Sequence, residues 1–166
     1  MELKPKLNYK KLLLIQLFNV IHCVEEYFFG FSEWATKHFG TTSQNWYLLS
    51  HVILAVILGV IAFYTYKGFR VGVFFAFAIQ VMIFTNGLFH IFTTILWREY
   101  APGVFAQILI LPVSCIVFRI IHQSGVLSKK AILYSTITGC MLSAFIVLSL
   151  FIDVPELVSQ HSFVRL

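Results

Sequence analysis

The sequence predicts an all-α fold, a polytopic membrane protein formed by a bundle of about five transmembrane helices. Composition is the first observation, because 59% of the 166 residues are hydrophobic, 17% are aromatic and only 11% are charged. This composition is typical of integral membrane proteins. The second observation is that apolar stretches of about 20 residues, the length that crosses a bilayer, recur five times. No linker rich in Ser, Gly or Pro divides them, so residues 1–166 are expected to form a single domain.

The first span is expected at residues 11–30. Its basic start followed by an apolar run is similar to a signal peptide, but Gln16, Asn19 and His22 interrupt the run. Because no small-x-small cleavage site follows, we interpret the segment as a retained transmembrane helix.

The later spans are expected at residues 46–66, 71–97, 102–121 and 131–152. Polar or glycine-containing turns separate them, at residues 40–45, 67–68 and 124–125. Pro102 suits the first turn of the fourth span, where a missing N–H costs little, and Pro112 is expected to kink that helix.

Basic residues are distributed unevenly between the two ends of the spans. Nine of the 12 lysines and arginines lie at the end that includes the amino terminus, and three lie at the other: Lys37, Arg98 and Arg165. The positive-inside rule therefore predicts a cytoplasmic amino terminus and an external carboxyl terminus. The expected location is the plasma membrane of a bacterium. The net charge of +5 is thus a topology signal, and we expect membrane lipids and no nucleic acid as partners. An outer aromatic belt is expected from Trp34, Trp46 and Trp97.

Four spans carry polar side chains at a similar depth in the outer leaflet. At about 1.5 Å per residue, His22 lies about 13 Å and Glu26 about 7 Å from the outer end of the first span. On the third span His90 lies about 10 Å deep and Asn86 about 16 Å. The layer also includes His51 on the second span and Gln107 on the fourth. Ionisable groups in a bilayer are costly, so the layer predicts a functional site.

The remaining histidines and the cysteines are not assigned to this layer. His38 and His161 are expected in loops, and His122 at the cytoplasmic interface. The cysteines have no Cys-x-x-Cys spacing and are expected to be buried thiols: Cys23, Cys115 and Cys140.

The spacing of the polar residues favours a metal site. His22 and Glu26 are four residues apart, so they share a helix face, as do Asn86 and His90. Adjacent ionised glutamates repel in a low dielectric unless a proton or a cation neutralises the pair. Two histidines and a carboxylate with an open position suit a divalent metal, Zn²⁺ or Fe²⁺, between which the sequence does not choose. The expected ligands are His22, Glu26 and His90.

Three further residues are expected to act in catalysis. Glu25 would be the general base for a water held by the metal. Asn86 would orient a ligand or donate to a developing oxyanion, and Tyr100 would donate a proton at the mouth of the site.

At these residues the chain resembles the HXXEE domain family, small membrane proteins of unestablished function. His22, Glu25 and Glu26 match the His-x-x-Glu-Glu motif, and Asn86 with His90 matches Asn-x-x-x-His. The family's Tyr-Ser-Pro-Gly is present at residues 100–103 as Tyr-Ala-Pro-Gly, so a serine hydroxyl at Ala101 cannot be essential here. The resemblance covers most of the chain and implies no reaction.

A weaker similarity is to intramembrane CAAX-type proteases, which also combine paired glutamates, histidines and an asparagine. The chain departs from them at Gly30, where their Glu-Glu-x-x-x-Arg motif requires arginine, and their His-x-x-x-Asn is reversed.

Three functions are compatible with the sequence. The first is a membrane-embedded, metal-dependent enzyme of hydrolase type that acts on a lipidic substrate from the outer leaflet. The second is a non-catalytic integral membrane interaction protein. The third is a proton-coupled carrier, against which the lack of an inverted repeat argues. The sequence does not indicate the oligomeric state.

Overall fold

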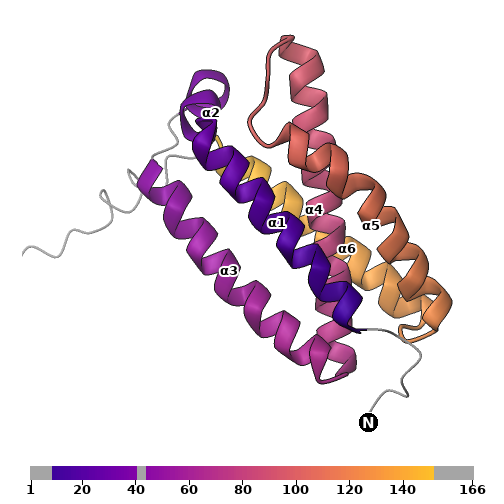
Figure 1. Cartoon of the computed structure of the whole chain (residues 1–166). Coiled ribbons are helices and arrows are strands. Elements are labelled where there is room, and N and C mark those ends of the chain that lie inside the picture. The colour runs from indigo at the N-terminus through magenta and orange to yellow at the C-terminus, as the bar shows by residue number, and fades with distance from the viewer. Residues whose placement is uncertain (1–8, 41–43, 152–166) are drawn as a thin grey trace, which may run out of the picture.

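All regular structure in the described part of the chain is helical. A computed structural model describes residues 9–40 and 44–151. Its helices, in chain order, are α1 (Tyr9–Phe28), α2 (Phe31–Phe39), α3 (Gln44–Tyr66), α4 (Arg70–Trp97), α5 (Val104–Ser124) and α6 (Lys129–Ser149). Figure 1 shows five long helices side by side, with the short helix α2 at one end of the bundle. The expected helical bundle is therefore confirmed.

Four of the described helices are long and apolar enough to cross a membrane, namely α3, α4, α5 and α6. This confirms a polytopic membrane protein. Within the described residues α1 is not one of the four, although it contacts both α3 and α5 along the bundle. That α1 is a fifth span stays a prediction. Lys4, Lys6, His161 and Arg165, which entered the orientation and loop predictions, lie outside the described residues.

Helix α4 forms the centre of the bundle. In the most apolar stretch of α4, 56% of the residues are buried, compared with 17% in the corresponding stretches of α3 and α6. One apolar cluster joins Val73 and Phe77 of α4 to Val117 of α5. A second joins Ile83 of α4 to Leu58 of α3 and to further residues of α5. Because α4 contacts every other long helix, its polar residues Gln80, His90 and Thr93 are buried inside the bundle.

A seam of small residues allows α6 to approach α4 closely. Ser135, Gly139 and Ser143 are buried and recur every four residues, so they form one helix face. A Cβ atom at Gly139 would lie 2.3 Å from the carbonyl oxygen of Ala78. Small residues at such a spacing are the usual means by which membrane helices bring their backbones together.

The segment after α1 differs from the expectation. His38, expected in a loop, lies on α2, where its ring stacks on Trp97 with centroids 4.0 Å apart. Glu99 accepts hydrogen bonds from Lys37 and His38, which hold the pKa of Glu99 below its usual value. This helix has only nine residues and several of them are polar, so the hydropathy pattern did not predict it. These contacts fasten α2 across the end of α4.

Two smaller expectations are also corrected. Pro102 does not begin the fourth long helix, because α5 starts at Val104, after a turn at Gly103. Cys115 and Cys140 are exposed rather than buried, on faces that an apolar environment would cover. Pro112 does lie inside α5, as expected.

Replacement of Gly139 by valine should destabilise the bundle. The new side chain would meet the α4 backbone, and overpacking of this kind costs about 1–3 kcal/mol. Gly59→Val is the matched control, because a Cβ atom there meets no described atom within 4 Å. Thermal aggregation of the detergent-solubilised variants measures the difference. Equal aggregation temperatures for the two variants would contradict the close α4–α6 contact.

Candidate metal centre

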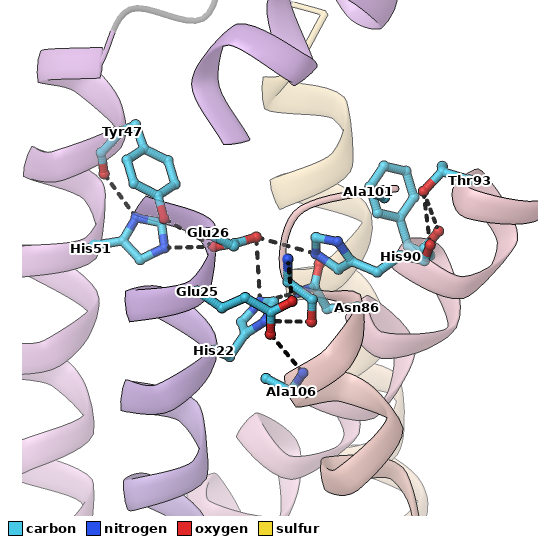
Figure 2. A network of polar contacts seen from close by, with 12 residues as sticks. His22, Glu25, Glu26, Tyr47, His51, Asn86, His90, Thr93, Ala101 and Ala106 are labelled. Atoms are coloured by element: carbon cyan, nitrogen blue, oxygen red, sulfur yellow. Dashed lines mark hydrogen bonds and ion pairs between the residues drawn. The ribbon is translucent and has the colours of Figure 1, made fainter. Parts of the chain in front are cut away.

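The carboxylate of Glu26 lies at the centre of a buried polar cluster (Figure 2). The residue is only 4% exposed. One carboxylate oxygen, Oε1, lies 3.4 Å from His22 Nε2 and 3.2 Å from His90 Nε2. The other, Oε2, accepts a hydrogen bond of 3.1 Å from the Tyr47 hydroxyl and lies 3.4 Å from His51 Nε2. Each oxygen therefore faces a different pair of side chains.

The three residues expected to bind a metal come together from two helices. One ligand atom each from His22, Glu26 and His90 lies within 4.8 Å of the other two, and all three residues are buried. The rings of His22 and His90 meet edge to face, with centroids 5.0 Å apart. Their proximity agrees with the depths and the helix faces expected for these residues from the sequence. That they bind a metal stays a prediction.

His22 has the orientation of a metal ligand. Its Nδ1 lies 3.3 Å from the carbonyl oxygen of Gly103, and a carbonyl only accepts, so Nδ1 carries the hydrogen. The lone pair of Nε2 then faces the cluster, where the amide nitrogen of Asn86 lies 3.2 Å away. Histidine ligands in proteins almost always donate their second ring N–H in this way. Asn86 thus lies beside His22, and its expected role toward a ligand or an oxyanion stays a prediction.

The turn before α5 brings Gly103 against this ring. Gly103 has a φ of 99°, in the region that favours glycine, and a Cβ atom there would lie 2.5 Å from Cε1 of His22. A larger residue would displace His22 from the carbonyl that holds it. The Tyr-Ala-Pro-Gly segment therefore shapes the site through its backbone.

His90 completes the buried pair of rings. Its side chain is 1% exposed, and Nε2 faces Glu26. Nδ1 has no hydrogen-bond partner among the described residues. The ring of Phe31, at the start of α2, lies 5.7 Å from the His90 ring and covers it on the α2 side. His90 is therefore covered by α2, the same helix that Glu99 binds through Lys37 and His38.

Helix α3 adds two residues to the cluster. From the sequence, His51 was expected at this depth without an assigned role, and Tyr47 was not considered. His51 lies four residues after Tyr47, and its Nδ1 is 2.8 Å from the Tyr47 carbonyl oxygen. Both side chains reach Glu26 Oε2. The signal was available, because His51 was expected at the depth of Glu26 and Tyr47 shares its helix face.

Glu25 binds the start of α5 and is not one of the three clustered ligand residues. Its carboxylate accepts backbone hydrogen bonds from Gly103 at 3.1 Å, Phe105 at 3.0 Å and Ala106 at 2.6 Å. The hydroxyl of Tyr100 donates a fourth, at 2.5 Å. Burial raises the pKa of Tyr100, and its bond to Glu25 raises it further. A carboxylate at a helix N-terminus satisfies unpaired N–H groups and complements the helix dipole.

This arrangement gives Glu25 and Tyr100 a positioning role, because they hold the turn that carries the His22 contact. Their expected roles as general base and proton donor stay predictions.

Deeper polar groups occupy the α4–α5 interface. Gln107, expected in the polar layer, is fully buried, and neither of its amide atoms has a partner among the described residues. It lies against Gly87, where a Cβ atom would come within 2.7 Å of its side-chain oxygen. Gln80 donates to Ser114 at 2.5 Å, a pair that the sequence analysis missed. Neither contact reaches the three expected ligands.

Comparison with known proteins gives one match. The model of a family described as "Protein of unknown function with HXXEE motif" matches residues 13–118. This range is more than half of the chain and contains all six residues predicted to act in the site. No curated protein and no solved structure matches the chain. Helix α6 lies beyond the matched range but packs along α4.

Loss of one histidine ligand should cost almost as much bound metal as loss of both. His22→Ala, His90→Ala and the double variant are each expected to bind Zn²⁺ at least tenfold more weakly, because ligands that act as a unit are strongly non-additive. Elemental analysis of the purified variants measures this. His122→Ala, at the far end of α5, is the control and should retain metal. Independent, additive losses would contradict a shared site.

Removal of the Glu25 carboxylate should destabilise the fold. Hydrogen bonds to a charged group contribute about 1.5–3 kcal/mol, so Glu25→Ala should lower the free energy of unfolding by a similar amount. Glu33→Ala, on the exposed face of α2, is the matched control. Thermal unfolding followed by circular dichroism compares the two. If Glu25→Ala were as stable as Glu33→Ala, the carboxylate would not hold α5.

Proposed function

We propose that this chain, which belongs to the HXXEE family, is a membrane-embedded, metal-dependent hydrolase that acts on a lipidic substrate. The observation that supports it is the convergence of His22, Glu26 and His90 within 4.8 Å in a buried site. Two histidines and a glutamate, with a fourth position for water, are a ligand set of hydrolytic zinc enzymes. The ligand set also suits Fe²⁺.

In such a hydrolysis the oxygen of a water molecule bonds to the carbonyl carbon of a lipid ester or amide. The C–O or C–N bond breaks, and the proton released by the water moves to the leaving group. When bound, the metal polarises the carbonyl and makes the water more acidic.

The protein groups have separate tasks in this proposal. His22, Glu26 and His90 hold the metal. Asn86, whose amide nitrogen lies 3.2 Å from His22 Nε2, donates to the oxygen that gains negative charge. Tyr47 and His51 fix the second oxygen of Glu26, which orients the carboxylate as a ligand. Glu25 fixes the turn at Gly103, and Glu25→Gln tests whether it is also the general base.

We place the site in the outer leaflet, with the amino terminus in the cytoplasm. Among the residues whose side chains the structure describes, five basic residues lie at the end of the bundle away from the site: Lys67, Arg70, Arg119, Lys129 and Lys130. Only Lys37 and Arg98 lie at the site's end within the same range, and Lys37 is paired with Glu99. The positive-inside rule supports this orientation.

Hydrolysis should depend on the three ligands. Protein in lipid nanodiscs, loaded with Zn²⁺ or Fe²⁺, would be incubated with a bacterial lipid extract, and released fatty acids and head groups would be measured by mass spectrometry. We expect product from the unmodified protein and from His122→Ala, and at least a hundredfold less from His90→Ala. Asn86→Ala should keep its metal and lose at least tenfold in rate.

Two results would count against this function. Absence of product from metal-loaded protein, or equal product from His90→Ala, would favour a non-catalytic interaction protein.

A further inference from the structure

A groove of about 490 Å³ runs between α1 and α3. Figure 1 shows these two helices side by side along the bundle. One end of the groove is lined by Cys23, Tyr47 and His51, and the other by Leu58, Gly59 and Ala62. The volume lies within the range of about 300–1,000 Å³ found for small-molecule sites. The groove therefore has room for one ligand of moderate size.

The polar end of the groove borders the candidate metal centre. Tyr47 and His51 line the groove and also contact Glu26 Oε2. Cys23 lines the groove at the same end. A molecule that enters the groove with its polar group at His51 is thus brought to the carboxylate that His22 and His90 share.

The other end of the groove is apolar. From His51, Gly59 is eight residues along α3, or about 12 Å, and Ala62 is about 16 Å away. Exposed residues such as Val52 and Val56 flank this part of α3, on a face that a bilayer would cover. Asn19 also lines the groove, whose other lining residues away from the His51 end are apolar. A groove of this length is complementary to a single hydrocarbon chain that carries one polar group.

Among the described side chains, none packs against Gly59. A Cβ atom there meets no described atom within 4 Å, whereas at Gly72 it would lie 2.4 Å from the backbone nitrogen of Thr65. Glycine within a helix costs about 1 kcal/mol relative to alanine. Gly59 lines the groove, so its missing side chain leaves space there.

We propose that the groove between α1 and α3 binds the single hydrocarbon chain of the substrate and that Gly59 limits the length of that chain. The inference rests on the proposed hydrolase function and names its substrate class, a single-chain acyl lipid whose polar group is at the end of the groove that borders the candidate metal centre. The chain enters from the bilayer between the two helices, so the substrate does not leave the membrane.

Photocrosslinking tests binding separately from hydrolysis. The unmodified protein and its variants in nanodiscs would be irradiated with two fatty acids that carry a terminal diazirine, one of ten carbons and one of sixteen. Mass spectrometry would locate and quantify the crosslinked peptides. We expect the longer probe to label the part of α3 beyond Gly59, with competition by unlabelled palmitic acid.

Gly59→Phe should fill the apolar end of the groove. Labelling of α3 by the sixteen-carbon probe is expected to fall at least fivefold, while labelling by the ten-carbon probe is kept. Val60→Phe, next to it but absent from the groove lining, is the matched control and should label as the unmodified protein does. His90→Ala should also label normally, because it removes a metal ligand and leaves the groove intact.

The outcomes separate the two proposals. Equal labelling of Gly59→Phe and Val60→Phe by the longer probe, or labelling that palmitic acid does not reduce, would overturn the groove assignment. Normal chain-length-dependent labelling in a protein that hydrolyses no lipid would retain the groove and reject the hydrolase.

Discussion

Burial of the Glu26 carboxylate is the constraint on which the site depends. An ionised carboxylate away from water is stable only when it is paired and hydrogen-bonded. Here Oε2 accepts a hydrogen bond from Tyr47 and faces His51, while Oε1 faces ring nitrogens of His22 and His90. These partners come from α1, α3 and α4, so the same requirement fixes three helices at one depth. A cation between the histidines and Oε1 would satisfy the charge further.

The two adjacent glutamates have different partners because successive helical residues point about 100° apart. Glu26 faces α3 and α4, whereas Glu25 faces the first turn of α5. The second interaction matters for the first, because it holds Gly103, whose carbonyl oxygen sets the tautomer of His22. The His-x-x-Glu-Glu motif therefore connects the candidate metal centre to a fourth helix. Because Glu25 and Glu26 are adjacent in the chain, the contact with α5 and the contact with the histidines are fixed relative to each other.

Much of the bundle could be predicted from the sequence, since span length and hydropathy report directly on the bilayer. Helical spacing and depth were sufficient to group His22, Glu26 and His90, because each quantity depends on one helix at a time. The orientation of Glu25 depends on where the start of α5 lies, and that is a contact between segments about 80 residues apart in sequence. Tyr47 was missed because a tyrosine near a membrane interface is ordinarily an anchor. Helix α2 was missed because its nine residues form contacts with Trp97 and Glu99 that no local pattern reveals.

The central claim is that His22, Glu26 and His90 bind one divalent metal, and X-ray absorption at the metal edge tests it most directly. Spectra of zinc-loaded protein should show two imidazole nitrogens at about 2.0–2.1 Å, with a carboxylate oxygen and one further light ligand. The outer-shell scattering from imidazole should fall in His90→Ala and persist in His122→Ala. A spectrum of hydrated zinc without imidazole scattering, or one unchanged in His90→Ala, would contradict the account.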